Sequence, residues 1–247
     1  MYFSLIFSFI FIVPVLVITW NLRKNISPYK TIFESIVIIA VLVIAVLLFA
    51  GSNGQSLGEQ FMNMVKSIAE VLAGTEEFVT TAGIGELTYE ERVTLIVSVY
   101  GMISSLLPST VLIASTVMTY FLYMLMSKIY KKIGGHPAEL IPLKYFRWPP
   151  NLMLGFLIIF LLSWLVGNAP IFAGTQIYTN VNLIFEFVVA VQGLAVVFLL
   201  FDAKKLPKIG AVVVGALGML TGIGRMILFA VGAVDYILNL RARVTRR

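Results

Sequence analysis

The sequence predicts an all-α fold, namely a polytopic transmembrane helical bundle of about six to seven membrane helices with an extracytoplasmic amphipathic helix. Of the 247 residues, 60% are hydrophobic and 12% are charged, whereas soluble domains carry about 25% charged residues. No Asp, Glu, Lys or Arg occurs in four long stretches, and a membrane helix needs about 20 apolar residues. These stretches are residues 1–22, 35–58, 93–127 and 148–185. We therefore expect residues 1–247 to form a single integral membrane domain.

The composition also excludes several kinds of chemistry. The chain has no cysteine, which excludes disulfides, thiolate metal sites and cysteine nucleophiles. His136 is the single histidine, and with Glu139 it would supply only two ligands, so we predict no metal site and no cofactor. No nucleophile with a base and an orienting group is recognisable, so we expect no enzyme.

The net charge of +6 is better explained by the orientation of a membrane protein than by nucleic-acid binding. Lys and Arg lie in the short connections between apolar stretches, as cytoplasmic loops of membrane proteins do. We therefore predict a cytoplasmic membrane protein whose partners include the lipid bilayer and exclude nucleic acid.

The first two helices are expected over residues 2–20 and 32–50, with a kink at Pro14. Arg23 and Lys24 between them indicate a cytoplasmic turn, so the N-terminus is expected outside. Met1 begins in apolar sequence without a basic region or a cleavage site, which favours a retained helix over a signal peptide.

Residues 59–92 carry seven acids and two basic residues, and we expect this segment to be extracytoplasmic. Its apolar residues recur at helical spacing, which predicts an amphipathic helix on the outer membrane surface or capping the bundle. Those residues are Phe61, Met64, Val65, Ile68 and Leu72. A capping box of Thr88 and Glu91 is expected to begin the next helix.

The uncharged stretch 93–127 would be about 52 Å long as a helix, more than one bilayer core of about 30 Å requires. Pro108 is expected to break it into an oblique or partly inserted helix over 92–107 and a crossing over 109–126. The five basic residues of 128–147 then predict the main cytoplasmic loop.

Two crossings are expected between residues 151 and 201, with their turn outside at 167–176. The second crossing carries Glu186 and Gln192. Six residues separate these two side chains, so they do not share a helix face, and only a neighbouring helix would bring them together.

Residues 209–240 have basic sequence at both ends, which predicts a helical hairpin with a cytoplasmic C-terminus. The hairpin is expected to break at "TGIGR", which would put Arg225 at its tip and Asp235 near the cytoplasmic side. Charges inside a membrane mark functional sites, so Glu186, Gln192, Arg225 and Asp235 are the ligand-binding candidates. Small residues lie on one face of the first arm and predict close helix packing, within the bundle or with a partner. They are Ala211, Gly215, Gly218 and Gly222.

Three phrases carry a resemblance to a known family. "VQGLAVVFLLFDAKKLPK", with Gln192 and Gly193, is followed by "VGAVDYILNLRAR", with Gly232, Asp235 and Arg241, and "PVLVITWNLRKN" occurs early. The chain resembles the YybS-like family of uncharacterised bacterial multi-pass membrane proteins. That family is similar in general architecture to substrate-binding S-components of energy-coupling-factor transporters and, loosely, to MreD-like proteins of cell-shape assemblies. Longer members begin with a further helical segment, which puts in doubt any site built from that segment.

Two functions follow as hypotheses. The chain would be the substrate-binding subunit of a small-molecule transport system, for which other membrane subunits or an ATPase module supply energy, because it has no ATP-binding motif. Alternatively, it would be a non-transporting scaffold that anchors a cell-envelope or cytoplasmic protein assembly. The ligand, if there is one, is not named by the sequence.

Overall fold

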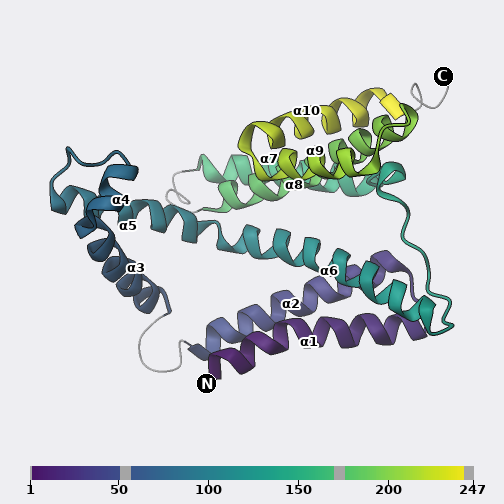
Figure 1. Ribbon diagram of the computed structural model, residues 1–247, viewed down its shortest axis with the longest axis horizontal. Coiled ribbons are helices and arrows are strands. Elements are labelled where there is room, and N and C mark those ends of the chain that lie inside the picture. Colours follow the sequence, from purple (N-terminus) through teal and green to yellow (C-terminus); the bar gives the residue numbers. More distant parts are fainter. Residues whose placement is uncertain (1, 51–56, 170–175, 242–247) are drawn as a thin grey trace. The chain divides into compact units, whose positions relative to one another are not determined.

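The computed structural model describes residues 2–50, 57–169 and 176–241 of the chain (Figure 1). Every element in these ranges is a helix, which confirms the predicted all-α class. The chain divides into two compact units, residues 1–138 and 139–247, and the single integral membrane domain stays a prediction. The division falls inside the basic connection 128–147.

Three long helices of the first unit pack together: α1 (Tyr2–Arg23), α2 (Pro28–Ala50) and α6 (Leu107–Lys132). The chain turns between α1 and α2 through Asn25, whose φ of 53° is left-handed; asparagine tolerates this region better than most residues. Buried Thr31, Ser35 and Thr119 are small polar residues that let helices approach closely. The Ser35 hydroxyl donates to the Thr31 carbonyl at 2.9 Å.

The same unit contains α3 (Leu57–Gly74), the short α4 (Glu76–Thr81) and α5 (Tyr89–Ser105). Ala69 and Ala73 of α3 and Ile96 of α5 form their common core. The predicted capping box is confirmed: Thr88 Oγ1 accepts from the Glu91 amide at 3.4 Å, and the Thr88 amide donates to Glu91 Oε2 at 2.9 Å. The expected break is also present, because α5 ends at Ser105 and α6 begins beside Pro108.

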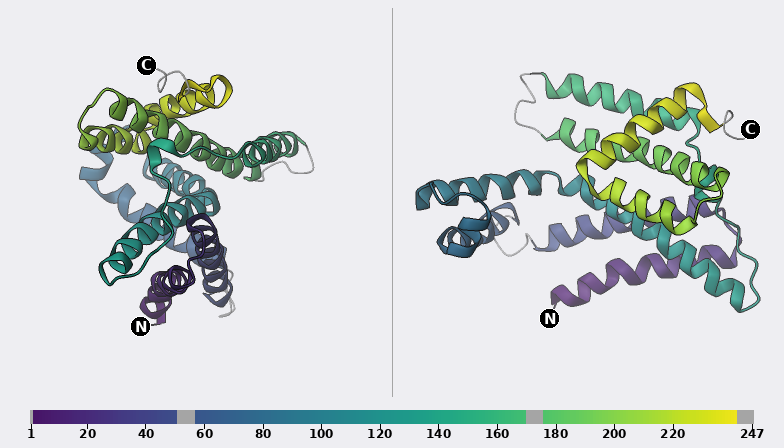
Figure 2. Two further views of the ribbon diagram at one scale, coloured as in Figure 1. Left: turned by 90° about the vertical axis from the view of Figure 1, so that its right-hand side faces the viewer. Right: turned by 45° about the horizontal axis from the view of Figure 1, so that its top comes forward.

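The second unit is built around α8 (Ile177–Ala203), which contacts α7 (Pro150–Gly167), α9 (Lys208–Leu220), α10 (Gly222–Leu238) and the short 3-10 helix η2 (Leu143–Tyr145) (Figure 2). Its closest approach is to α10. A Cβ on Gly193 would lie 1.9 Å from the Leu228 carbonyl oxygen, and one on Gly232 would lie 2.1 Å from the Val189 carbonyl oxygen. Only glycine at both positions allows the two backbones to touch in this way.

The small-residue face expected on the first hairpin arm is in contact along part of its length. Ala211 and Gly215 are buried, and a Cβ on Gly215 would meet the Leu194 side chain at 2.4 Å. Gly218 lies against the Leu228 side chain. Gly222 begins α10 instead, and a Cβ there would meet nothing within 4 Å.

Among the described residues, three helices are long and apolar enough to cross a membrane: α6, α7 and α8. The pair α9 and α10 raises the number to four if it forms one span. These helices make the chain a helical membrane protein, but the expected six to seven crossings are not confirmed. The break at Thr221 falls in "TGIGR" as expected, and the pair bends there by 109°. With 13 residues, α9 is about 20 Å long and too short to cross a core of about 30 Å by itself.

Candidate functional site

A buried polar cluster joins α8 and α10 beside their glycine contact. Gln192 is 0% exposed and Asp235 is 1% exposed. Gln192 Nε2 donates a hydrogen bond of 2.7 Å to Asp235 Oδ2. The glycines explain the short distance, since Gly193 and Gly232 lie beside these side chains and bring the helices together.

Arg241 completes the cluster because the chain reverses after α10. Asn239, with a φ of 48°, ends the helix in the left-handed region and folds the following residues back. Arg241 then donates from its backbone amide to Asp235 Oδ1 at 3.3 Å and from Nε to Asp235 Oδ2 at 3.0 Å. Its side chain is only 12% exposed. Burial lowers the pKa of Arg241, while the charge of Asp235 acts in the opposite direction.

The same groups fasten the connection that enters α7. The Arg241 guanidinium donates to the carbonyl oxygens of Phe146 and Gln192. The Trp148 amide donates to Gln192 Oε1 at 3.2 Å, and its indole Nε1 donates to the Val188 carbonyl at 2.8 Å. We call Gln192, Asp235 and Arg241, with the carbonyl of Phe146 and the amide of Trp148, the polar clasp.

Two outer contacts hold the same connection. Lys144 Nζ lies 2.8 Å from Asp202 Oδ2, and this hydrogen bond is the main reason that the pKa of Lys144 is raised. Arg147 donates to Asn239 Oδ1 at 3.3 Å. Residues 144–148 are thus fixed to the ends of both α8 and α10.

The other two ligand-binding candidates form a separate, looser pair. Arg225 Nε lies 3.7 Å from Glu186 Oε2, and both side chains are more than one-third exposed. Asn182 Nδ2 donates to Glu186 Oε1 at 2.9 Å. The four candidates named from the sequence are therefore brought together by α10, as two pairs: Glu186 with Arg225 and Gln192 with Asp235.

Sequence reasoning did not name Arg241 as a site residue, because it treated this arginine as one of several topology-setting charges. A signal was present: Asn239 follows the last apolar turn, and asparagine can end a helix in the left-handed conformation. That ending returns the next residues toward Asp235. The charge partner of the buried aspartate is for this reason found within its own C-terminal turn.

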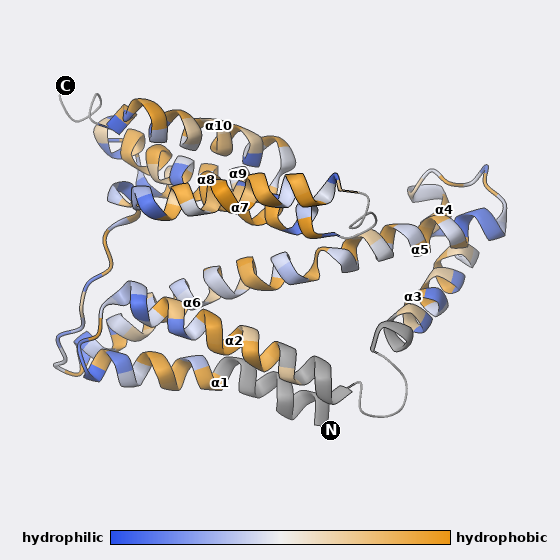
Figure 3. Cartoon of the chain, turned by 180° about the vertical axis from the view of Figure 1, so that it is seen from behind, coloured by the Kyte–Doolittle hydropathy of each residue, from blue (hydrophilic) through white to orange (hydrophobic). Residues whose placement is uncertain are grey.

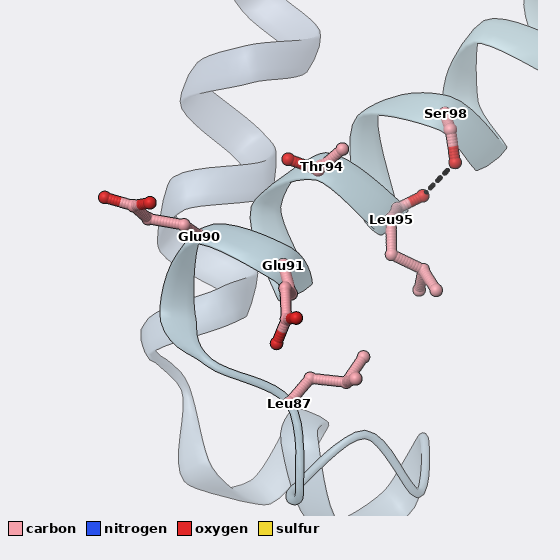
Figure 4. Close-up of a pocket in the computed structure, with 6 residues that line it drawn as sticks. All are labelled: Leu87, Glu90, Glu91, Thr94, Leu95 and Ser98. Carbon is pink, nitrogen blue, oxygen red and sulfur yellow. Dashed lines mark hydrogen bonds between the residues drawn. The ribbon is translucent and has the colours of Figure 1, made fainter.

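A hollow of about 520 Å³ lies in the first unit, open along the start of α5 (Figure 4). It is lined by Leu87, Glu90, Glu91, Thr94, Leu95 and Ser98. Hydrogen bonds from Thr88 to Glu91 lower the pKa of this carboxyl group, so Glu91 is already occupied as a cap. Within the described residues, no group of three His, Cys, Asp or Glu could hold a metal ion.

The fold and the charge pattern define the chain as a helical membrane protein, and comparison with known proteins gives its family. Residues 1–236 match the family described as "Predicted membrane protein (DUF2232)", and the chain belongs to this family. It is 23% identical over 159 residues to "Uncharacterized protein YybS" of Bacillus subtilis (strain 168), a match over 63% of this chain and 50% of that protein. The chain spans about half the length of this curated relative. No solved structure matches. The YybS-like resemblance is confirmed, and the likeness to transporter S-components stays a prediction.

Proposed function

We propose that the chain is a non-catalytic membrane scaffold, which holds a protein partner on the side of the membrane that carries its basic connections. The observation that supports this proposal is the polar clasp. Together with the outer contacts of Lys144 and Arg147, it fixes residues 144–148 to α8 and α10, so basic side chains are presented on an ordered surface instead of on a loose loop.

The hydrogen bonds of the clasp argue against a ligand at the same place. Gln192 donates to Asp235 and accepts from Trp148, while both oxygens of Asp235 accept hydrogen bonds. A ligand site needs polar groups that are left for the ligand. A ligand that entered here would break buried hydrogen bonds, and each unsatisfied group costs about 1 to 3 kcal/mol.

The surface beside the clasp suits an acidic partner. Lys144 is held at the end of α8 by Asp202. Lys204 and Lys205 follow in the turn after α8, and Lys208 is the first residue of α9. Such a cluster of one sign steers and orients a partner of opposite charge. By the charge rule this surface would be cytoplasmic, in a bacterial inner membrane.

The alternative is the S-component-like transport subunit, which would act with other membrane subunits or an ATPase module. What favours it is the Glu186 and Arg225 pair, because a contact of 3.7 Å between partly exposed groups can exchange for a charged small molecule at low cost. A ligand held there would be small and ionised.

The test is purification of the full chain from its native membrane in mild detergent, followed by mass spectrometry of copurifying proteins and small molecules. We expect a stoichiometric protein partner that is lost from the triple variant Lys204→Glu, Lys205→Glu, Lys208→Glu. The matched control Lys66→Glu reverses one exposed charge in the first unit and should keep the partner. A small molecule that binds saturably and raises the unfolding temperature, with no protein partner, would contradict the scaffold proposal and support the transport subunit.

A further inference from the structure

The helix pair α3 and α5 has an apolar surface that its own packing leaves exposed. On α3, Met64 and Val71 are 53% and 69% exposed, and on α5 Met102 is 71% exposed. These residues belong to a set that we call the outer apolar face. Its members are Met64, Ile68, Val71, Leu95, Val99 and Met102.

Helical periodicity shows that the outer apolar face is one stripe on each helix. Spacings of four and three residues join Met64, Ile68 and Val71, and the same spacings join Leu95, Val99 and Met102. On each helix this stripe comes one residue before the buried stripe, which includes Val65 and Ala69 on α3 and Ile96 on α5. One residue is a rotation of about 100°, so each exposed stripe flanks the contact between the helices.

The two stripes lie on the same side of the pair. The end of α3 lies beside the start of α5, where the Tyr89 hydroxyl donates to the Glu70 carbonyl at 3.2 Å, so the helices run in opposite directions (Figure 1). Equal rotations on two facing helices of opposite direction point to one side, because their handedness is the same. The outer apolar face therefore lies on one side of both helices.

Charge is separated along α5. The charged residues Glu76, Glu77, Glu86, Glu90, Glu91 and Arg92 lie in α4 and around the start of α5, whereas residues 93–105 carry no charge. Figure 3 shows this change along α5, from its hydrophilic start to its more apolar end. That end leads through Leu106 into α6, which is long and apolar enough to span a membrane.

We propose that the outer apolar face inserts into the lipid surface on the side of the membrane where α6 begins. Covalent continuity with α6 keeps the uncharged end of α5 at the bilayer, while the charged start of α5 stays in water. On α3, a third arc carries the exposed residues Asn63, Lys66, Ser67 and Glu70 and faces water, as in helices that lie at a membrane interface. Met64 and Met102 enter most deeply, and Val71 and Leu95 lie nearer the headgroups.

The absence of cysteine makes the test direct. The full chain, with a single cysteine that carries a bimane fluorophore, is placed in nanodiscs of phosphatidylethanolamine and phosphatidylglycerol with or without doxyl-labelled lipid. Met64→Cys and Met102→Cys should be quenched at least about twofold more than the matched controls Lys66→Cys and Thr94→Cys, which lie on the same helices but on their polar sides. Leu95→Cys should give an intermediate value.

Three results would overturn the proposal. Equal quenching of Met64→Cys and Lys66→Cys would show that α3 has no preferred side toward lipid. No quenching, with a polar emission spectrum, would show a face in water. An emission spectrum typical of an apolar environment, without quenching, would mean that protein covers the outer apolar face. Dilution of the labelled chain with unlabelled chain would then show whether the covering protein is a second copy or another part of the same chain. Circular dichroism of each variant confirms that its helices are intact.

Discussion

The helix pairs α8 with α10 and α3 with α5 bury their contacts by different means. The first pair brings backbones together at Gly193 and Gly232 and then satisfies every group of the polar clasp. The second pair packs alanine and isoleucine side chains and leaves an apolar stripe beside them exposed. A contact whose polar groups are all hydrogen-bonded fixes one geometry of the two helices. A contact that leaves apolar side chains exposed can still bind lipid. The predictions below test this difference from the largest expected effect to the smallest.

The largest effect is expected when the clasp loses one charge. Arg241→Met leaves Asp235 buried without its partner, and breaking a buried pair costs about 3 to 5 kcal/mol. The unfolding temperature in detergent should fall clearly, and fluorescence-detected size exclusion would measure it. Asp235→Asn with Arg241→Gln should restore part of the loss, because no buried charge then remains.

Arg225→Gln is the matched control for this prediction. It also removes an arginine of the second unit, but the pair of Arg225 with Glu186 is partly exposed and 3.7 Å long, so a change of about 0 to 1 kcal/mol is expected. If Arg225→Gln and Arg241→Met lowered the unfolding temperature equally, burial of the polar clasp would add nothing to its contribution to stability.

The glycine contact should give the next effect. In Gly193→Leu a side chain would meet the backbone of Leu228, and overpacking of this kind costs about 1 to 3 kcal/mol. Gly232→Leu should behave alike, and thermal unfolding measures both. The control is Gly155→Leu on α7, where a Cβ meets nothing within 4 Å. If Gly155→Leu lowered the unfolding temperature as much as Gly193→Leu and Gly232→Leu, this would contradict the proposed contact between α8 and α10.

A smaller effect is expected in the first unit at the start of α5. Thr88→Ala removes the capping box, and such caps contribute about 1 kcal/mol. Amide hydrogen exchange over residues 88–95 should become faster, while exchange in the second unit stays unchanged. Unchanged protection at the start of α5 would mean that the cap adds nothing there.

The pH dependence of the same cap has a definite sign. The pKa of Glu91 is lowered by its hydrogen bonds to Thr88, so its stabilising effect is complete above the unfolded pKa of about 4.5. It is lost as the pH falls through the lower folded value. Hydrogen exchange between pH 6 and 3, corrected for the intrinsic rate, should show this loss in the native chain and not in Glu91→Gln.

Local signals in the sequence predicted much of the fold. The uncharged stretches gave the helical membrane class, Pro108 and "TGIGR" gave two breaks, and Thr88 with Glu91 gave a cap, because each depends on residues close together in the chain. The number of crossings was not predictable in this way. An apolar segment such as α9 has the composition of a membrane helix but is too short to cross a bilayer by itself. Whether it forms part of a crossing depends on how sharply the chain bends between α9 and α10.

The candidate site was predictable only as a set of residues. Gln192, Asp235, Glu186 and Arg225 stood out because polar groups in apolar helices are costly. Their pairing was not visible, since Gln192 and Asp235 are 43 residues apart and meet only because two glycines let α8 and α10 touch. Arg241 joined them through the left-handed Asn239, whose conformation is decided by tertiary contacts as well as by residue type.

The last prediction leaves stability unchanged and asks on which side of the membrane the two ends of α9 and α10 lie. A bend of 109° fits either a broken span or a re-entrant pair, and the basic residues at both ends favour the re-entrant form, with both ends cytoplasmic. In intact cells, Lys205→Cys and Thr245→Cys should then both be protected from a membrane-impermeant maleimide, whereas Gly224→Cys at the bend should react. Thr245→Cys labelled from outside while Lys205→Cys stays protected would establish a broken span. That result would contradict the contacts of Lys144 with Asp202 and of Arg147 with Asn239, which hold the ends of α8 and α10 together, and the ordered basic surface would lose its support.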